Sequence, residues 1–240
     1  MKISEIYAVL DTIAPFCDQE AWDNSGLILG NLQDEVSQIY LSLDLDSALV
    51  DSAKPNSLFI THHPLIFKGL KSLNPSVYPA NLIYKMVQKN ISLISLHTNY
   101  DKHILNKFVA ENVLKYEITD IKDFIVFMKI DMKFDDLARD IKEKLQISNL
   151  RVVKTKDHIQ TIALCTGSGS EMIPNSNIDC FLTGDLKYHT ALENFENNVS
   201  LIDINHFESE RYFAESLAKI LQKNKIEVII TNSINPFKYY

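Results

Sequence analysis

Two adjacent histidines, His62 and His63, have the clearest capacity for metal chemistry in this sequence. They belong to the stretch THHPLIF and follow a short apolar run, LFI, that predicts a buried strand. Where a strand ends and the chain turns, neighbouring imidazoles can point to one place, and open α/β sheets bind their ligands at such strand ends. Neutral imidazole is also the commonest metal ligand in proteins. Alone, the pair is explained as well by one histidine that caps a helix and one that packs, so further ligands must decide.

Asp101, His206 and Glu210 are the further candidates for metal ligands. His206 and Glu210 are four residues apart at the start of an expected helix, so both side chains can meet the same ion from one helix face. Asp101 follows an expected strand by a few residues, as a carboxylate ligand in a loop would. Each has a plain structural explanation as well: a local His–Glu pair for His206 and Glu210, and a helix N-cap for Asp101.

The number of these ligands favours two ions over one. Three imidazoles and two carboxylates exceed what a single tetrahedral zinc site with an open position needs. They suit two divalent transition-metal ions about 3.5–4 Å apart that share a carboxylate and activate water. Nitrogen and oxygen donors of this kind fit iron, zinc or manganese and do not choose among them. His103 and His158 stand in polar surroundings and are interpreted as surface residues.

Helices and strands are expected to alternate along the whole chain. The pattern of apolar residues predicts helices over residues 3–14, 47–53, 79–90, 102–115, 134–145, 188–195 and 209–223, and strands over residues 39–46, 58–60, 91–96, 150–153, 161–165, 178–182, 199–204 and 227–231. Such alternation predicts an α/β fold with mixed, mostly parallel sheets covered by helices.

The same order of elements occurs twice, which predicts an α/β repeat over residues 1–120 and a second one over residues 121–240. THHPLIF and HTNYD end two strands of the first repeat, and TGDLKYH and NHFESE end the corresponding strands of the second. Because residues of the ligand type gather at equivalent strand ends, we expect the metal site in the cleft between the repeats.

The composition restricts the class of protein. The chain has 240 residues, of which 46% are hydrophobic, and a net charge of −7, so a packed core is expected and a broad basic surface for nucleic acid is not. No apolar run approaches the ~18 residues of a membrane span, and the N-terminus has no signal-peptide core. Three scattered cysteines, Cys17, Cys165 and Cys180, indicate a reducing compartment. These features predict a cytoplasmic protein without a membrane partner.

Taken together, the motifs resemble those of the NIF-three-like family, also named the GTP cyclohydrolase I type 2 homologues. EAWDNSGLILG, THHPLIF, SLHTNYD, TGDLKYH and NHFESE occur in the right order over essentially the whole chain. The resemblance implies two intertwined α/β repeats, a homohexameric ring, and a dinuclear centre at His62, His63, Asp101, His206 and Glu210, with Glu210 bridging the ions. Two departures stand beside the distal histidine: Asn205 replaces the family's common glycine, and Phe207 replaces its frequent tyrosine.

The resemblance also implies a reaction. GTP and water would give 7,8-dihydroneopterin triphosphate and formate, with His97 or His189 as the catalytic proton shuttle. Trp22, Asp23 and Lys187 are the residues expected to contact the nucleotide. Two alternatives remain open: another dinuclear metal hydrolase such as a phosphoesterase, and a non-enzymatic ring, stabilised by metal, that binds partners or DNA through a basic lumen.

Overall fold

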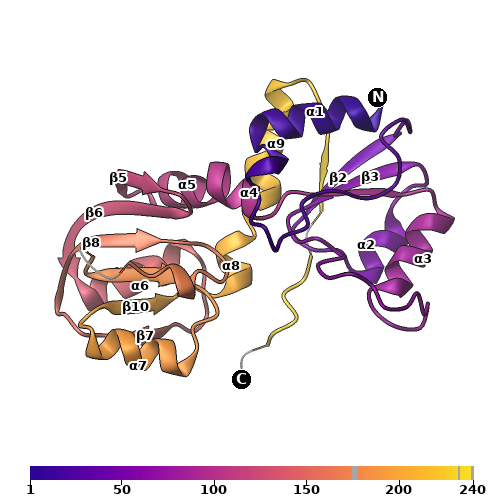
Figure 1. Ribbon diagram of the computed structural model, residues 1–240. Coiled ribbons are helices and arrows are strands. Elements are labelled where there is room, and N and C mark those ends of the chain that lie inside the picture. The colour runs from indigo at the N-terminus through magenta and orange to yellow at the C-terminus, as the bar shows by residue number, and fades with distance from the viewer. Residues whose placement is uncertain (175–177, 232, 239–240) are drawn as a thin grey trace. The chain divides into compact units, whose positions relative to one another are not determined.

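A computed structural model describes residues 1–174, 178–231 and 233–238, and its chain divides into two compact units (Figure 1). The first unit combines Met1–His103 with Phe213–Ile234, and the second combines Ile104–Tyr212 with Asn235–Tyr240. These units differ from the expected halves, which meet at residue 120. The physical reason is that the helix and strand after residue 212 return to the first sheet and complete it.

The first unit contains a five-stranded mixed sheet. Its order is β1 (Gly26–Leu29), β4 (Ser92–Ser95), β3 (Ser57–Thr61), β2 (Gln38–Ser42) and β11 (Ile229–Ile230). Strand β1 pairs antiparallel with β4, and all other pairs are parallel, as in the pairing of Phe59 with Tyr40 on one side and Leu93 on the other. The carboxyl ends of β2, β3 and β4 therefore meet at one edge of this sheet.

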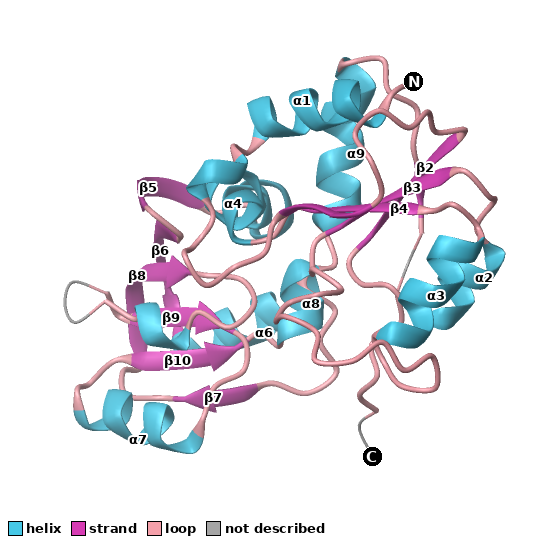
Figure 2. Cartoon of the chain, turned by 45° about the vertical axis from the view of Figure 1, so that its right-hand side comes forward, coloured by secondary structure: helices cyan, strands magenta, loops and turns pink. Residues whose placement is uncertain are grey.

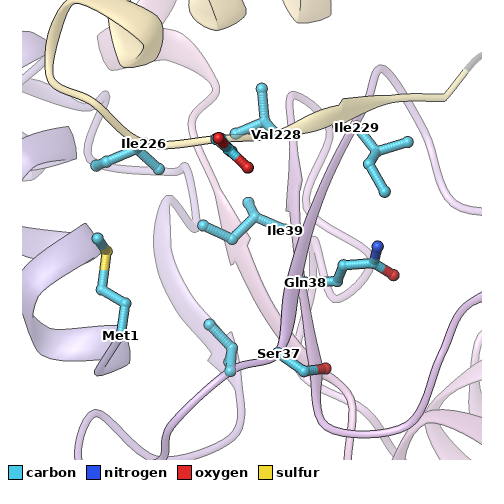
Figure 3. Close-up of a pocket in the computed structure, with 9 residues that line it drawn as sticks. Met1, Ser37, Gln38, Ile39, Ile226, Val228 and Ile229 are labelled. Atoms are coloured by element: carbon cyan, nitrogen blue, oxygen red, sulfur yellow. The ribbon is translucent and has the colours of Figure 1, made fainter.

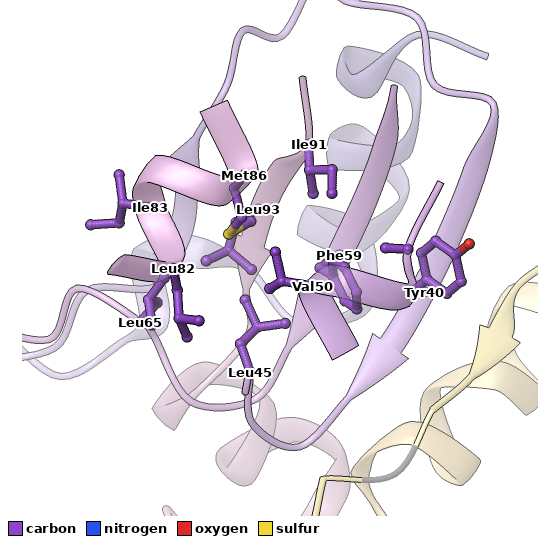
Figure 4. Close-up of a cluster of buried hydrophobic side chains, with 11 residues drawn as sticks. Tyr40, Leu45, Val50, Phe59, Leu65, Leu82, Ile83, Met86, Ile91 and Leu93 are labelled. Carbon is purple, nitrogen blue, oxygen red and sulfur yellow. The ribbon is translucent and has the colours of Figure 1, made fainter. Parts of the chain in front are cut away.

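Helices cover both faces of the first sheet (Figure 2). Helices α1 (Ile3–Ile13) and α9 (Phe213–Lys223) lie on one face, and α2 (Ser47–Ser52) and α3 (Ala80–Gln88) lie on the other. Figure 4 shows the core under α2 and α3, where Val50, Leu82 and Met86 pack against Phe59 and Leu93. Strands that are buried on both faces require continuous apolar runs, which explains the sequence SLFIT in β3.

A long helical stretch follows β4 and changes its winding along its length. It consists of α4 (Thr98–Tyr100), the π-helical segment η2 (Asp101–Leu105), α5 (Asn106–Phe108) and a second π-helical segment, η3 (Val109–Leu114). The helix expected over residues 102–115 is thus present, and it begins a turn earlier. Asp101 opens the first π-helical segment, and π-helical turns are frequent at functional sites.

The second unit contains a six-stranded sheet with both pairing types. Its order is β5 (Glu117–Lys122), β6 (Ile125–Lys133), β8 (His158–Leu164), β9 (Cys180–Thr183), β10 (Ser200–Asp203) and β7 (Arg151–Val153). Strands β8, β9 and β10 are parallel, whereas β5, β6 and β7 pair antiparallel. The mixed sheet is confirmed, but this one is less parallel than expected, because the β5–β6 hairpin adds two antiparallel strands.

Helices of the second unit follow the expected segments closely. Helix α6 (Phe134–Lys144) contacts β6, and α7 (Tyr188–Glu196) contacts β10 and β7. The single helix expected over residues 209–223 is instead two: α8 (His206–Glu210), in this unit, and α9 in the first. Among the described residues, no helix has both the length and the apolar character needed to cross a bilayer.

The two sheets share one order over four strands. In the first unit this order is β1-β4-β3-β2, and in the second it is β7-β10-β9-β8. In both cases the first strand is antiparallel to the second, and the other pairs are parallel. Strand β3, which leads to His62, thus corresponds to β9, and β4 corresponds to β10, which leads to His206. This is the correspondence that the strand-end motifs predict.

Candidate metal centre

Three histidines of the first unit lie at the shared carboxyl edge of β2, β3 and β4. His62 and His63 follow β3 directly, and His97 follows β4 by two residues. Backbone hydrogen bonds hold the strand ends in register beyond the sheet, from the His63 amide to the Leu43 carbonyl at 3.1 Å and from the Leu96 amide to the Thr61 carbonyl at 2.9 Å. The imidazoles therefore start from a rigid backbone, as a pre-formed ligand site requires.

Hydrogen-bond acceptors beside the Nδ1 atoms set the ring orientation of His62 and His63. Nδ1 of His62 lies 2.8 Å from the Leu96 carbonyl oxygen, and Nδ1 of His63 lies 2.6 Å from Oδ1 of Asp44. A carbonyl oxygen accepts but never donates, so Nδ1 of His62 carries the hydrogen. In a neutral ring, Nε2 is then a lone-pair donor. Metal-binding histidines typically show this arrangement, with the outer nitrogen held by a carbonyl or carboxylate.

His97 belongs to the same group of imidazoles. Its Nδ1 lies 2.7 Å from Oδ1 of Asp23, which repeats the pattern seen at His63. The ligand atoms offered by His62, His63 and His97 all lie within 4.8 Å of one another. The structure thus places His97 close enough to serve as a ligand or to exchange a proton beside one.

Asp23 has a role that differs from the expected contact with substrate. Its side chain is fully buried, and its two oxygens accept hydrogen bonds from His97, from the Ser25 hydroxyl, and from the amide and hydroxyl of Thr98. Burial by itself raises the pKa of this carboxyl, but the His97 ring, the Thr98 hydroxyl and the Asn24 amide outweigh burial and hold the pKa far below its usual value. Asp23 is therefore an anion that orients His97, and it is not exposed to a ligand.

Asp101 contributes a carboxylate to the cluster of the first unit. Its Oδ1 lies 3.4 Å from Nε2 of His62, and its side chain is 13% exposed. A lone pair of a neutral imidazole facing a carboxylate oxygen is electrostatically unfavourable, and a cation or proton at that place makes it favourable. The donor set of His62, His63 and Asp101 therefore fits a divalent ion.

The second unit repeats this construction at the carboxyl edge of β8, β9 and β10. Gly167 follows β8, Asp185 follows β9, and His206 follows β10. Nδ1 of His206 lies 2.7 Å from Oδ2 of Asp185, and its Nε2 lies 3.0 Å from Oε2 of Glu210 on the same face of α8. The expected pairing of His206 with Glu210 is thus present, and the opposed Nε2 and carboxylate again fit a cation.

Close backbone approaches fix the position of the Glu210 carboxylate. A Cβ built on Gly167 would lie 2.0 Å from Oε1 of Glu210, and one on Gly184 would lie 2.6 Å from the His206 amide nitrogen. The Ser209 hydroxyl accepts a hydrogen bond from the Gly167 amide at 3.0 Å. These contacts explain the glycines of the TGSG and TGD turns, where side chains would displace the His206 segment.

Asn205 holds an uncommon backbone conformation directly before His206. Its φ of 57° and ψ of 153° lie in a region that glycine populates far more readily than other residues. Its amide donates to Oδ1 of Asp203 at 3.1 Å. The strained turn aims His206 at Asp185, which accounts for the preference for glycine here in the family that the sequence resembles.

The other expected catalytic and binding residues of the second unit lie at the start of α7. His189 is exposed near the start of α7, where its ring lies 5.3 Å from that of Tyr188. Lys187 is exposed at the N-cap of the same helix. Two amides of the turn TGSGSEM already have partners in neighbouring elements, since Gly167 donates to Ser209 of α8 and Gly169 donates to Thr183 of β9.

The two histidines expected on the surface are in the expected places. Exposed carboxylates accompany both, with His103 at 2.8 Å from Asp18 and His158 at 2.5 Å from Asp131. Trp22, expected to contact the substrate, is 56% exposed and lies near His97.

A shallow pocket of about 400 Å³ in the first unit lies away from these side chains (Figure 3). It follows β2 and residues 226–229, and Met1, Ile39 and Val228 are among its lining residues. Glu227 is the carboxylate among the lining residues, and no imidazole accompanies it. Its chemistry does not match that of a metal site.

Sequence reasoning missed the carboxylates that orient the imidazoles. Asp44 holds His63, and Asp185 holds His206. The sequence pattern identifies Asp44 only as part of a strand and Asp185 only as part of a turn. The available signal was position: each aspartate follows a strand that is adjacent and parallel to the strand before its histidine. Residues that end neighbouring parallel strands meet at one edge, so the partners were predictable in principle.

Comparisons with known proteins identify related sequences. The sequence model described as Duf34/NIF3 (NGG1p interacting factor 3) matches residues 1–236. A Campylobacter jejuni protein named GTP cyclohydrolase 1 type 2 homolog is 51% identical over 241 residues, which cover 100% of both chains. A Helicobacter pylori protein named GTP cyclohydrolase 1 type 2 is 40% identical over 98% of both.

A solved structure shows the same fold. The crystal structure of Staphylococcus aureus protein SA1388 is 30% identical in sequence and superposes with a TM-score of 0.89, over 100% of this chain and 99% of that one. The match of the family model to nearly the whole sequence, together with these relatives, shows that this chain belongs to the Duf34/NIF3 family.

Proposed function

We propose that this protein is a metal-dependent hydrolase that converts GTP and water into 7,8-dihydroneopterin triphosphate and formate. The observation that carries the metal dependence is the common orientation of four imidazoles, each with Nδ1 against a carbonyl or carboxylate oxygen. The names of the relatives from Campylobacter jejuni and Helicobacter pylori support the reaction type and the nucleotide.

Five residues are proposed as ligands of two divalent ions, which are iron, zinc or manganese. His62, His63 and Asp101 of the first unit and His206 and Glu210 of the second would hold these ions. Ions bound by these residues would lower the pKa of water and polarise the reacting carbon. The protein itself contributes Asp44, which holds the His63 ring, and Asp185, which holds the His206 ring.

His97 is proposed to hold and release the proton of the attacking water at Nε2. Asp23 fixes the hydrogen of His97 on Nδ1, which leaves Nε2 as an acceptor, and a ring nitrogen of His97 lies within 4.8 Å of those of His62 and His63. The same geometry would allow His97 to act as a ligand. The variant His97→Ala separates these roles: loss of formate release with two ions retained supports proton transfer, and loss of an ion identifies a ligand.

Metal content tests the ligand assignment directly. Anaerobically purified protein is expected to contain close to two transition-metal ions per chain by elemental analysis. His62→Ala and His206→Ala are expected to lower that content strongly, while His158→Ala, which changes a histidine with a similar carboxylate partner on the surface, leaves it unchanged. Equal metal content in all three variants would contradict the assignment.

Formate release from GTP tests the reaction. Metal-loaded protein is expected to release one formate per GTP consumed, and Glu210→Gln is expected to abolish this while the fold persists. Release of phosphate in place of formate would replace the cyclohydrolase by a phosphoesterase that uses the same ligands. No turnover of any nucleotide, with metal bound, would favour a structural role for the ions.

Self-association is proposed as a further property, in the form of a homohexameric ring. Helix α7 supports it with an exposed apolar stripe, since Tyr188, Leu192 and Phe195 are each at least 45% exposed and recur at helical spacing. Light scattering on the intact protein tests the mass. Leu192→Glu is expected to lower it, and a monomeric wild-type protein would contradict the ring.

A further inference from the structure

We propose that Trp22 and Phe67 form an aromatic wall that stacks the purine ring of a nucleotide beside the imidazoles of the first unit. This inference rests on the proposed function in its choice of a purine nucleotide, and it deepens that function by naming the residues that recognise the base. The rings of Trp22, Phe67 and His97 all belong to the first unit.

The two aromatic rings are near neighbours and are open to solvent. Their centroids lie 5.8 Å apart with an interplanar angle of 57°, and the side chains are 56% and 42% exposed for Trp22 and Phe67 respectively. A tilted pair of this kind leaves a ring face uncovered. Large aromatic side chains usually bury most of their surface, so this exposure of two adjacent ones indicates a binding surface.

His97 links this wall to the candidate metal ligands. Its ring is edge-on to both aromatics, at 6.2 Å and 78° to Trp22 and at 6.0 Å and 86° to Phe67. The same ring lies 5.1 Å from that of His62 and 5.6 Å from that of His63. A flat ligand stacked on the wall would therefore present one edge to the imidazoles, which is where a carbon of the base must lie to be hydrolysed.

The loops that carry Trp22 and Phe67 are tied together and to His97. The Asn24 side chain donates to the Ile66 carbonyl at 2.6 Å, which connects the two loops beside the aromatics. The Ser25 hydroxyl donates to Asp23 and accepts from the His97 amide, at 3.1 Å in both cases. A wall held in place before binding loses little entropy when a ligand stacks on it.

The chemistry of the wall favours a base over a sugar or a phosphate. Two aromatic faces attract a flat heteroaromatic ring, and base–aromatic stacking is a common means of nucleotide binding. The bicyclic indole of Trp22 matches a purine in width. Phosphate groups would need cationic partners, which these rings do not supply.

Trp22 itself provides the probe, because it is the only tryptophan of the chain. Guanosine 5′-monophosphate is titrated into protein that has been treated with a chelator and into metal-loaded protein, with excitation at the red edge of the tryptophan band. We expect saturable quenching of the emission in both forms. Ribose 5-phosphate and inorganic phosphate, which lack the base, are expected to leave the emission unchanged.

Variants then locate the base on the wall. Phe67→Leu keeps an apolar side chain but removes the ring, and we expect it to weaken binding of guanosine 5′-monophosphate about 5- to 100-fold, as loss of one stacking partner does. Tyr84→Ala is the matched control, since Tyr84 on α3 of the same unit is 46% exposed and its removal should not change the affinity. Calorimetry on Trp22→Ala measures the same loss without the probe.

Any one of three binding or assembly results would overturn the proposal, and so would one kinetic result. The three are the absence of saturable quenching by guanosine 5′-monophosphate in both forms, equal affinities in Phe67→Leu and Tyr84→Ala, and a change in the mass of ligand-free Trp22→Ala by light scattering. The last would identify the wall as a contact between copies of the chain. Binding is measured without turnover, so the two proposals can fail separately. Quenching with no formate release would contradict the proposed reaction alone. Formate release with an unchanged KM in Phe67→Leu would contradict only the aromatic wall.

Discussion

Gly167 leaves free the space that the Glu210 carboxylate fills, since a Cβ on Gly167 would lie only 2.0 Å from Oε1 of Glu210. Gly167 also has a φ of +64°, a conformation that side chains adopt with strain. The two residues come from the turn after β8 and from α8, so the position of a candidate bridging ligand depends on a glycine more than forty residues away in sequence.

Gly167→Ala is therefore expected to displace the Glu210 carboxylate and weaken metal binding by roughly tenfold or more, as changes beside a metal ligand do. Competition with a chromogenic chelator measures the affinity. Gly69→Ala is the control, because nothing lies within 4 Å of a Cβ at that position. Unchanged metal affinity in Gly167→Ala, with the fold intact, would show that Glu210 is not required where the structure places it.

Asn205→Gly is expected to stabilise the protein. Asn205 lies at φ 57° and ψ 153°, where a non-glycine residue costs about 1–3 kcal/mol. Among the described residues its Nδ2 is also a buried donor without a hydrogen-bond partner. Urea unfolding should show a higher free energy of unfolding than wild type. Asn198→Gly, at φ 61° just after α7, is the comparison, and an equal gain there would point to a general effect of glycine.

Asp185→Ala is expected to weaken metal binding by about 10- to 100-fold without removing a ligand. Asp185 holds the hydrogen of His206 on Nδ1, so its loss frees the ring to rotate and to change tautomer. Titration of the chelated protein with Zn²⁺ gives the affinity. Asp131→Ala removes the same kind of partner from His158 on the surface, and the hypothesis fails if both variants bind Zn²⁺ as the wild type does.

Asp179 is expected to contribute to stability in a defined acidic range. Burial raises the pKa of its carboxyl, but the Lys156 ammonium, the amides of Gln160 and Thr161, and the Thr161 hydroxyl outweigh burial and lower it from 3.8 to about 2. A pKa lowered by folding stabilises the native state above the unfolded-state pKa, and the contribution disappears as the pH falls from about 4 to about 2.

Asp179→Asn tests this range. The variant should be less stable than wild type by urea unfolding at about pH 5, and the difference should shrink as the pH falls towards 2. Asp157→Asn, which changes a nearly fully exposed carboxylate, should show no such trend. A difference between Asp179→Asn and wild type that does not vary with pH would assign the effect to packing alone.

The order of helices and strands could be predicted because the core is built from regular apolar patterns. The run LFI before His62 predicts β3 correctly, since its strand is buried on both faces and every residue in it must be apolar or hydrogen-bonded. Strand β5 of the β5–β6 hairpin was missed for the opposite reason. Residues of β5 such as Glu117, Asp120 and Lys122 are exposed, so its pattern resembles that of a loop.

The division into units could not be predicted from local patterns. Residues 227–231 predict a strand, but nothing in them specifies which sheet the strand joins. The structure pairs β11 with β2, near the other end of the chain, and α9 contacts both strands, so this pairing involves residues far apart in the sequence.

The candidate ligands could be predicted from residue type. The residues that orient them could be predicted only with knowledge of how the strands pair. His62 and Glu210 stand out as ligand types at strand ends, but the role of Asp23 depends on which backbone amides and rings its carboxylate meets. A buried carboxylate and one exposed to a ligand look alike in a sequence. Only the fold distinguishes them.

The pairing of β11 with β2 has a consequence for how the protein is made. Strand β11 is the last of the described strands to be synthesised, so the outer edge of β2 stays unpaired until nearly all of the described chain has been made. A chain truncated after Tyr212 lacks α9 and β11, and its first unit is expected to be sensitive to protease and dependent on chaperones.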